Sequence, residues 1–537
     1  MSAVLEIVGL TVALPNGADR PFALEDVSLG LQGGEILCMV GESGSGKSMA
    51  AGAVMRLLPP GVRVSAGRIA LAGTDLLALS EPAMRQVRGA RIAMVFQDPM
   101  TALNPLRRIG DQVGEIFAAH TPLARGEVRR RVLALLGEVR LPDPAAIARA
   151  FPHELSGGQR QRAVIAMALA LEPAVLIADE PTTALDVTTQ AQILALIRDL
   201  QRRRGTAVLL ITHDFGVVAD IADRVAVMQA GRVVEQGPAA VILRRPRHPY
   251  TQALIAAVPP LARAVGAADP LAHAPPVLVA EGVSKTFGRP GLFRRGRVTR
   301  AVDDVSLALP RGGTLGIVGE SGSGKSTLAR CIVRLLEPEA GSIRLHGTDL
   351  LRLTRRDLRR QAARVQMVFQ DPFASLNPRR RAGDLVAQGP MLHGVGRAEA
   401  DARARELFAL VGLQPDAVDR FPHEFSGGQR QRIGLARALA LRPEVLVADE
   451  AVSALDVSVQ AQVLRLLADL RARLGLSMIF ITHDLRVAAQ ICDRVAVMRE
   501  GRVVEQGDAA AVLGAPRHAY TQALVAAVPG RSWTPPS

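Results

Sequence analysis

A large part of this sequence occurs twice. Residues 151–162 return as 421–432, with Phe425 as the one difference. Other pairs at the same offset of 270 residues are 178–180 with 448–450, 211–214 with 481–484, and 232–237 with 502–507. Solenoid repeats have periods of only about 20 to 50 residues. The sequence therefore predicts two copies of a whole domain, at 1–262 and 276–537, joined by an Ala- and Pro-rich linker at 263–275.

Short apolar runs alternate with helical patterns inside each copy. In the first copy, residues 36–40, 174–178 and 208–211 are typical of strands buried on both faces. Residues 188–204 have the apolar spacing of a helix. This strand–helix–strand order predicts an α/β domain with a parallel sheet. Residues 107–171 are mostly helical in pattern, and we expect them to form a separate lobe.

Two identical Gly-rich segments, residues 41–48 and 319–326, fit the pattern of a phosphate-binding loop. The chain has 65 Lys and Arg residues, but only three are Lys, and two of these are Lys47 and Lys325 of the loops. The loops therefore favour a compact ammonium over a planar guanidinium. We expect them to bind nucleotide phosphates, with Ser48 and Ser326 as Mg²⁺ ligands. A flexible Gly/Ser turn is the competing interpretation, which the duplication disfavours.

A pair of carboxylates ends one apolar run in each copy, as Asp179-Glu180 and Asp449-Glu450. Close to a phosphate loop, the Asp of each pair suits Mg²⁺ binding and the Glu suits activation of a water as general base. Acids that merely cap a strand are the alternative for any single pair. Other apolar runs end in a Gln or a His that recurs in register with these motifs, so a role facing the terminal phosphate is expected for Gln97, Gln370, His213 and His483.

The composition excludes several classes of function. The net charge of +14 comes from Arg residues spread along the chain in short runs without aromatics, which indicates solvated helix faces and no nucleic-acid partner. Attraction to an anionic membrane surface is a further interpretation. The three cysteines show no C-x-x-C spacing, so no structural zinc is expected. We see no signal peptide and no run of about 18 apolar residues that would span a bilayer.

Six motifs occur in the same order in both copies, and together they resemble the nucleotide-binding domain of the ATP-binding cassette (ABC) superfamily. They are the phosphate loop, the Q-loop Gln, the signature motif at 155–159 and 425–429, the Asp-Glu pair, the D-loop at 184–186 and 454–456, and the switch His. The resemblance covers nearly the whole chain. It implies two tandem α/β P-loop NTPase domains, each with a parallel-sheet core, an antiparallel β subdomain and a helical lobe.

The resemblance also implies how ATP is held. Two ATP molecules would lie between the copies, each between the phosphate loop of one copy and the signature motif of the other. Lys47 would share an ATP with Ser426 and Gly428, and the second loop would share one with the first signature motif. Because both copies carry the full residue set, we predict two hydrolytic sites. Stacking of adenine is implied for Phe287, whereas the first copy has Leu14 at the matching position.

The full set of expected site residues follows from these motifs. The expected catalytic residues are Glu180, Glu450, His213 and His483. The expected Mg²⁺ ligands are Ser48, Gln97, Asp179, Ser326, Gln370 and Asp449. The expected ATP-binding residues are Gly41, Glu42, Ser43, Gly44, Ser45, Gly46, Lys47, Ser48, Gln97, Ser156, Gly157, Gly158, Gln159, Phe287, Gly319, Glu320, Ser321, Gly322, Ser323, Gly324, Lys325, Ser326, Thr327, Gln370, Ser426, Gly427, Gly428 and Gln429.

Two local features resemble the ATPase subunits of dipeptide, oligopeptide and nickel importers. One is the Q-loop extension at 96–105 and 369–378, and the other is a tail with the sequence RHPYTQAL at 247–254 and RHAYTQAL at 517–524. The resemblance implies two membrane permease subunits and an extracytoplasmic solute-binding protein as partners. It also implies a peripheral location at the cytoplasmic face of the inner membrane. Peptides are the favoured cargo, and nickel chelates, glutathione and opines are the other candidates.

Other classes of twin-cassette protein remain as alternatives. A ribosome-associated factor usually has a long charged connector, whereas this linker is short and rich in Ala and Pro. A DNA-repair ATPase interrupts its cassettes with zinc modules, which three cysteines cannot supply. The ATPase of an exporter or a drug-resistance protein is disfavoured only by the Q-loop and tail features.

Overall fold

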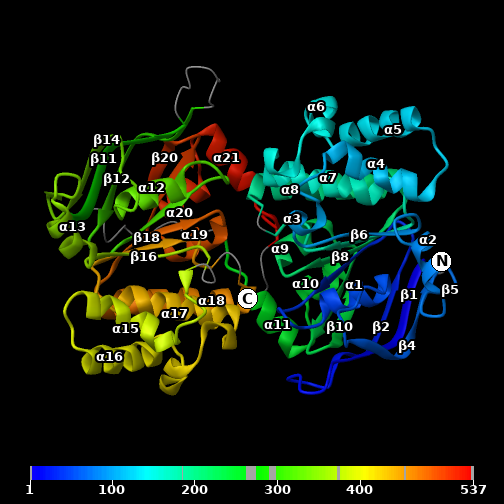
Figure 1. Ribbon diagram of the computed structural model, residues 1–537, viewed down its shortest axis with the longest axis horizontal. Coiled ribbons are helices and arrows are strands. Elements are labelled where there is room, and N and C mark those ends of the chain that lie inside the picture. The colour runs from blue at the N-terminus through cyan, green and yellow to red at the C-terminus, as the bar shows by residue number, and fades with distance from the viewer. Residues whose placement is uncertain are drawn as a thin grey trace. The chain divides into compact units, whose positions relative to one another are not determined.

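The computed structural model describes residues 3–183, 185–261, 274–288, 298–371, 375–452 and 455–533. The chain divides into two compact units, one made of Met1–Leu185, Thr189–Val258 and Pro529–Ser537, and the other of Asp186–Thr188 and Pro259–Val528 (Figure 1). We refer to the two copies of the repeat as the first and the second half. The expected linker at 263–275 lies outside the described residues except for its last two positions, so this boundary stays a prediction.

A six-stranded sheet forms the centre of the first half, in the order β10-β9-β3-β8-β7-β6. Five of its strands pair in parallel, as the strand–helix–strand pattern predicts. The edge strand β10 is antiparallel to β9, because Ala230 and Gly231, both with positive φ, close a two-residue hairpin between them. The strands are β3 (Ile36–Val40), β6 (Ile92–Val95), β7 (Val175–Asp179), β8 (Ala207–Thr212), β9 (Arg224–Gln229) and β10 (Arg232–Pro238).

The second half repeats this sheet, in the order β16-β17-β18-β13-β19-β20. Its edge strand β20 is again antiparallel to its neighbour. The strands are β13 (Thr314–Val318), β16 (Val365–Val368), β17 (Val445–Asp449), β18 (Ser477–Thr482), β19 (Arg494–Arg499) and β20 (Arg502–Asp508). In both halves the carboxyl ends of the parallel strands meet at one edge, where ligand sites of α/β sheets form.

A separate four-stranded sheet accompanies each central sheet, in the orders β2-β1-β4-β5 and β12-β11-β14-β15. All of its pairings are antiparallel, as the family resemblance implies. The strands are β1 (Leu5–Ala13), β2 (Phe22–Leu31), β4 (Arg63–Leu71), β5 (Thr74–Asp75), β11 (Pro276–Phe287), β12 (Thr299–Pro310), β14 (Ala340–Leu345) and β15 (Thr348–Asp349).

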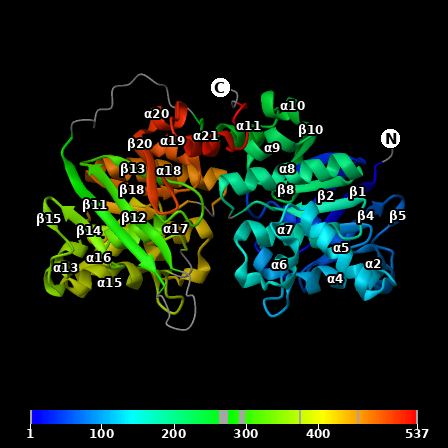
Figure 2. The ribbon, with the colours of Figure 1, turned by 90° about the horizontal axis from the view of Figure 1, so that it is seen from above.

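The expected helical lobe is present in the first half. Helices α4, α5 and α6 gather on one side, away from the strands of the antiparallel sheet (Figures 1 and 2). The helices of this half are α1 (Lys47–Met55), α2 (Glu81–Val87), α3 (Pro99–Ala102), α4 (Ile109–His120), α5 (Arg125–Glu138), α6 (Pro144–Arg149), η1 (Pro152–Glu154), α7 (Gly157–Leu169), α8 (Val187–Arg204), α9 (Phe215–Ile221), α10 (Ala239–Arg244) and α11 (Pro249–Ala256). The expected helix at 188–204 therefore agrees with α8 to within one residue.

The second half has the same helical plan, with α15, α16 and α17 forming its lobe (Figure 1). Its helices are α12 (Lys325–Ile332), α13 (Arg355–Ala362), α15 (Ala382–Leu392), α16 (Arg397–Leu410), η2 (Pro415–Asp419), η3 (Pro422–Glu424), α17 (Gly427–Leu439), α18 (Val457–Leu474), α19 (Leu485–Ile491), α20 (Ala509–Gly514) and α21 (Ala519–Ala526). Among the helices described, none combines the length and the apolarity that a membrane crossing demands.

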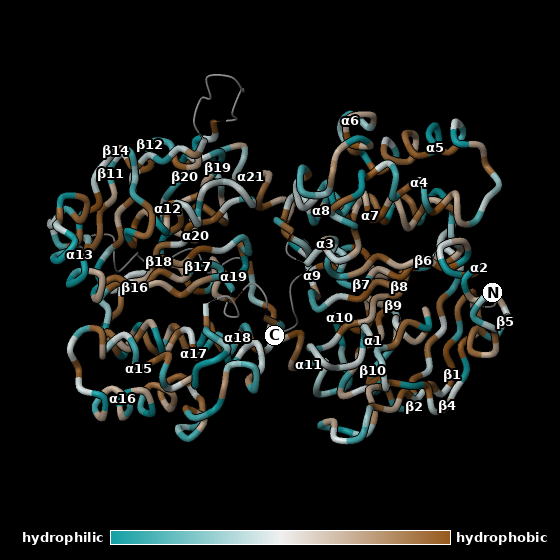
Figure 3. The backbone as a smooth tube through the Cα atoms, in the orientation of Figure 1, coloured by the Kyte–Doolittle hydropathy of each residue, from teal (hydrophilic) through white to brown (hydrophobic). Residues whose placement is uncertain are grey.

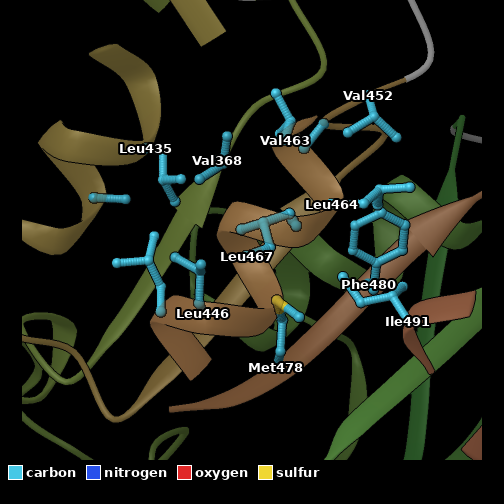
Figure 4. Close-up of a cluster of buried hydrophobic side chains, with 14 of the residues drawn as sticks. Val368, Leu435, Leu446, Val452, Val463, Leu464, Leu467, Met478, Phe480 and Ile491 are labelled. Atoms are coloured by element: carbon cyan, nitrogen blue, oxygen red, sulfur yellow. The ribbon is translucent and has the colours of Figure 1, made fainter. Parts of the chain in front are cut away.

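The cores are aliphatic, which agrees with an aromatic content of only 3%. Three inner strands of each central sheet are buried along their whole length, namely β3, β7 and β8 in the first half and β13, β17 and β18 in the second. The central sheets are largely brown in Figure 3, whereas the Arg-rich helix α13 is mostly teal. Figure 4 shows Val463, Leu464 and Leu467 of α18 packed among side chains of the sheet, including Met478 and Phe480. This packing holds the carboxyl ends of the strands, and the polar residues that follow them, in fixed positions.

Candidate active site in each half

The phosphate loop of the first half joins β3 to α1. Helix α1 begins at Lys47, so the first free N–H groups of the helix point into the loop. Gly41 has a φ of 153°, and a Cβ there would lie 2.3 Å from the carbonyl oxygen of Met228. Only glycine fits this position. The loop of the second half has the same geometry, with α12 beginning at Lys325.

The lysine of each loop is buried and bound to the loop itself. Lys47 is 5% exposed, and its Nζ donates hydrogen bonds to the carbonyl oxygens of Gly41 and Glu42, both at 2.8 Å. In the second half, Lys325 Nζ lies 2.8 Å from the oxygen of Gly319. Burial lowers the pKa of Lys325, and the carboxylates of the neighbouring Asp-Glu pair oppose that shift. The ammonium is thus held beside the backbone N–H groups of the loop, and together these positive groups favour binding of an anion.

The serine that follows the lysine meets the Asp at the end of β7. Ser48 Oγ donates a hydrogen bond of 3.1 Å to Asp179 Oδ1, and the corresponding distance from Ser326 to Asp449 is 3.0 Å. Burial raises the pKa of both Asp carboxyls, although the serine hydrogen bonds oppose the shift. Hydroxyl and carboxylate oxygens in this arrangement are the hard donors that Mg²⁺ prefers.

The Glu next to this Asp is surrounded by the other predicted residues. Glu180 Oε2 accepts a hydrogen bond of 2.9 Å from Gln97 Nε2, which lies just after β6. Its Oε1 lies 3.4 Å from Nδ1 of His213, which follows β8. Burial alone would raise the pKa of Glu180, but hydrogen bonds from His213 and Thr183 outweigh it and lower the pKa to about 2. The carboxylate is therefore ionised and fixed in place.

The second half repeats this arrangement. Gln370 Nε2 donates a hydrogen bond of 2.7 Å to Glu450, and His483 Nδ1 lies 3.4 Å from the same carboxylate. Burial lowers the pKa of His483, but the contact with Glu450 outweighs this and raises it. The structure thus brings the Gln, Glu and His of each half together, although about 80 and 30 residues of sequence separate them.

Each signature motif begins a helix. Ser156 is the N-cap of α7, and its Oγ accepts a hydrogen bond from the backbone N–H of Gln159. The side-chain oxygen of Gln159 accepts in return from the N–H of Ser156, which closes a capping box. Gly158 packs against α8, where a Cβ would lie 2.5 Å from Thr189. Ser426 caps α17 in the same way, so both motifs present an exposed helix N-terminus.

A comparison with protein families decides what this combination of motifs is. The model of the ABC transporter family matches residues 24–183 and 302–453, which together make up more than half of the chain. The chain belongs to the ABC transporter family. The resemblance inferred from its motifs is thereby confirmed, and the protein is an ATP-binding protein that hydrolyses ATP. A second family model, the C-terminal region of oligopeptide/dipeptide transporters, matches residues 234–287 and 504–532.

Two relatives of this ABC ATPase align with nearly all of its sequence. The glutathione import ATP-binding protein GsiA of Salmonella typhimurium is 47% identical over 98% of this chain and 89% of its own length. The oligopeptide transport ATP-binding protein OppD of Mycobacterium tuberculosis is 44% identical over 98% of this chain and 99% of its own. A solved ATP-binding cassette with ADP and phosphate bound is 28% identical, over 43% of this chain and 98% of its own, with a TM-score of 0.40.

The two halves of the ABC ATPase differ at the expected adenine position. Phe287 ends β11 and is exposed, with Lys285 Nζ lying 5.9 Å from the ring centroid. The strand registers place Leu10 opposite Val27 and Val283 opposite Val305, so Leu14 is the counterpart of Phe287. Leu14 is partly buried against the core and offers no ring for stacking. Contact of Phe287 with adenine stays a prediction.

One pair of contact residues in the ABC ATPase was not predicted from the sequence. Tyr250 and Tyr520 lie in the tail helices α11 and α21, and each hydroxyl contacts the backbone of a phosphate loop. A usable signal was present, because these are the only two Tyr residues of the chain and they occupy the same place in both tails. The Ala of each D-loop, at positions 184 and 454, lies outside the described residues.

Proposed function

We propose that this chain supplies both ATPase domains of an importer and hydrolyses Mg²⁺-bound ATP at two sites. The observation that supports this most strongly is the repetition in both halves of one arrangement, a Glu held by a Gln and a His beside a Ser–Asp pair. Two complete sets favour two hydrolytic sites over one active and one silent site. The tail segments, which match the oligopeptide/dipeptide family model, favour an importer of peptide-like solutes.

Each residue of the site has its own role in ATP binding or hydrolysis. Lys47 exchanges its two backbone carbonyls for phosphate oxygens when ATP enters, because a doubly charged phosphate is the stronger acceptor. Ser48 and Asp179 would hold Mg²⁺, which would supply positive charge next to the phosphates. Glu180 accepts the proton of the attacking water, while Gln97 and His213 hold its carboxylate in position. The second half uses the corresponding residues, with Lys325 and Glu450 as the phosphate ligand and the base.

We further propose that each ATP is completed by the signature motif of the other half. The exposed N-termini of α7 and α17 carry free N–H groups and a positive dipole end, which suits the terminal phosphate. Lys47 then acts with Ser426 and Gly428, and Lys325 with Ser156 and Gly158. Closure of the two halves would need ATP, and hydrolysis would release it, which couples the chemistry to a membrane partner.

The partners and cargo follow from the same proposal. The chain docks on two membrane permease subunits at the cytoplasmic face of the inner membrane, and an extracytoplasmic solute-binding protein delivers the solute. Small peptides and glutathione are the favoured cargo, since one relative of this chain is named a glutathione import ATP-binding protein and another an oligopeptide transport ATP-binding protein. A ribosomal or exporter function has no support from the tail segments.

The test is purification and transport. The chain is co-expressed with two permeases of the peptide-importer class and extracted from membranes. We expect one chain for each permease pair. Proteoliposomes that contain this complex should take up labelled glutathione or dipeptide, and this uptake should cease in the E180Q/E450Q variant. Sedimentation with ribosomes instead of membranes would refute the importer assignment. Two copies of the chain per permease pair would refute the proposed stoichiometry.

A further inference from the structure

The tail helix of each half contacts the phosphate loop through one tyrosine hydroxyl. In the first half, the Tyr250 hydroxyl accepts a hydrogen bond of 3.1 Å from the backbone N–H of Glu42 and donates one of 3.2 Å to the Glu42 carboxylate. In the second half, the backbone N–H of Glu320 donates a hydrogen bond of 3.2 Å to the Tyr520 hydroxyl. The two contacts span 208 and 200 residues of sequence and recur in both copies.

The contacted peptide group is the one that also binds the lysine of the loop. The peptide bond between Gly41 and Glu42 has its oxygen 2.8 Å from Lys47 Nζ and its N–H on Tyr250. A peptide group is planar, so fixing both of its ends fixes its orientation. Lys325 and Tyr520 hold the peptide bond between Gly319 and Glu320 in the same way. These glycines have φ values of 153° and 151°, a conformation that glycine adopts readily and other residues rarely adopt.

The tyrosine is itself held firmly by the tail. The Glu235 carboxylate of β10 accepts hydrogen bonds from the backbone N–H groups of Arg247 and His248, at 2.7 and 3.1 Å. His248 Nδ1 then accepts from the N–H of Tyr250 and caps α11. Burial would raise the pKa of Glu235, but the Thr251 side chain and these two hydrogen bonds outweigh it and lower the pKa, so the carboxylate is charged. A carboxylate at a helix N-terminus is electrostatically favourable.

The second tail uses the same anchor. Glu505 of β20 accepts hydrogen bonds of 2.8 and 3.1 Å from the N–H groups of Arg517 and His518. Tyr520 is 7% exposed, and burial raises its pKa to about 12, so its hydroxyl stays protonated at neutral pH. The guanidinium of Arg499 lies 5.1 Å from the centroid of its ring.

Packing alone does not account for a tyrosine at these positions. The chain has 13 Phe and only 2 Tyr residues, and both Tyr residues are the ones that reach the loops. A ring that only filled space could be Phe, as it is elsewhere in this chain. The hydroxyl is therefore the part of the side chain that these positions require.

We propose that Tyr250 and Tyr520 are positioning residues that hold the two phosphate loops in their ATP-binding shape, so that each tail sets the ATP affinity of its own half. The inference rests on the proposed role of the loops in binding ATP. Loss of the hydroxyl frees the peptide group that faces the lysine, and the loop then has to be ordered when ATP binds. The cost falls on binding and not on the chemical step, because the hydroxyl makes its described hydrogen bonds to the phosphate loop.

The experiment uses the full chain with the double variant Y250F/Y520F. A net hydrogen bond contributes about 0.5–1.5 kcal/mol, so we expect ATP to bind about three- to tenfold more weakly and KM to rise by the same factor with kcat nearly unchanged. Melting temperature without nucleotide should fall no further than in the control variant below, whereas the rise in melting temperature on adding ATP should shrink. The matched control is Q252M/Q522M, which removes hydrogen bonds of 3.0 and 3.1 Å from the same tails without reaching the loops.

A reference variant, K47A/K325A, distinguishes the proposed role of the tyrosines from the proposed role of the phosphate loops in binding ATP. If the lysine variant loses ATP binding and the tyrosine variant matches the wild type, the tyrosine proposal is wrong and the function of the loops stands. If the lysine variant also binds ATP with wild-type affinity, the proposal that the loops bind ATP is itself wrong. Should the double tyrosine variant unfold, the single variants Y250F and Y520F give two independent tests. A fall in kcat at unchanged KM would also overturn the positioning role.

Discussion

Ser48 Oγ donates a hydrogen bond of 3.1 Å to Asp179 Oδ1, although 131 positions separate the two residues. The reason is the order of the central sheet, because β3 pairs with β8 and β8 pairs with β7, all in parallel. The loop after β3 and the acid at the end of β7 therefore meet at one edge. The second half repeats the contact between Ser326 and Asp449 at 3.0 Å.

This contact predicts how the protein depends on Mg²⁺. Replacement of both serines in S48A/S326A removes one hard oxygen from each site, and we expect half-maximal hydrolysis to need about tenfold more Mg²⁺. The measurement is phosphate release over a Mg²⁺ titration at saturating ATP. An unchanged Mg²⁺ requirement would show that these hydroxyls are not ligands.

Removal of the two general bases should separate binding from hydrolysis. In E180Q/E450Q the amide keeps the shape of the side chain but cannot take a proton from water, so turnover should fall by about 10²–10⁴-fold. ATP binding should persist, and ATP should lock the halves together because it is not consumed. Phosphate release and equilibrium binding measure the two effects, and continued turnover would remove Glu from the role of base.

The loops should not accept arginine in place of lysine. Lys47 and Lys325 are 5% and 4% exposed, each with backbone carbonyls around one small ammonium. A guanidinium is larger and planar, so K47R/K325R keeps the charge but misplaces it. Loss of a charged hydrogen bond costs about 1.5–3 kcal/mol, and ATP affinity should fall by about tenfold or more. Wild-type affinity in this variant would mean that charge alone suffices.

The adenine position predicts a difference between the two sites. With the first site silenced by K47A, F287A should weaken ATP binding at the second site, since stacking of a base on an aromatic ring contributes about 1–3 kcal/mol. With the second site silenced by K325A, L14F should strengthen binding at the first. Competition between ATP and GTP reports base selectivity in each background. No response to F287A would place adenine elsewhere.

The buried thiols predict a pH dependence of stability. Cys38 and Cys492 are fully buried, and burial raises the pKa of both thiols far above its usual value. Above a pH of about 8.5 only the unfolded state ionises them, so stability falls as pH rises, by about 1.4 kcal/mol per thiol at pH 9.5. Urea unfolding of the wild type and of C38A/C492A at pH 7.5 and 9.5 checks this. The variant should lose less stability between the two pH values.

The same burial predicts the chemical reactivity of these thiols. In the folded protein, N-ethylmaleimide at pH 7.5 should leave Cys38 and Cys492 unmodified, because the neutral buried thiol is a poor nucleophile. Both should react once urea unfolds the chain. Mass spectrometry of the labelled protein gives the count, and rapid labelling in the native state would contradict the packing of the core.

Much of the fold and of the site was predictable because its signals are local in sequence. The repeat at an offset of 270 residues predicted two copies of one domain, and the apolar runs predicted β3, β7 and β8 to within one residue at either end. The Gly-rich loops and the carboxylates at strand ends pointed to nucleotide chemistry. Such patterns reflect local backbone conformation and the burial of side chains, and both depend mainly on residues that are close in the sequence.

The contacts that need long-range pairing were not predictable in this way. Nothing local to Gln97, Glu180 or His213 shows that they meet, because only the parallel register of β6, β7 and β8 brings their strand ends together. The antiparallel edge strand β10 and the tyrosine that reaches each phosphate loop likewise came only with the tertiary structure. The sequence by itself determined which chemical groups the protein carries and that it carries them twice. Their mutual distances were decided by sheet order and by packing between segments far apart in the chain.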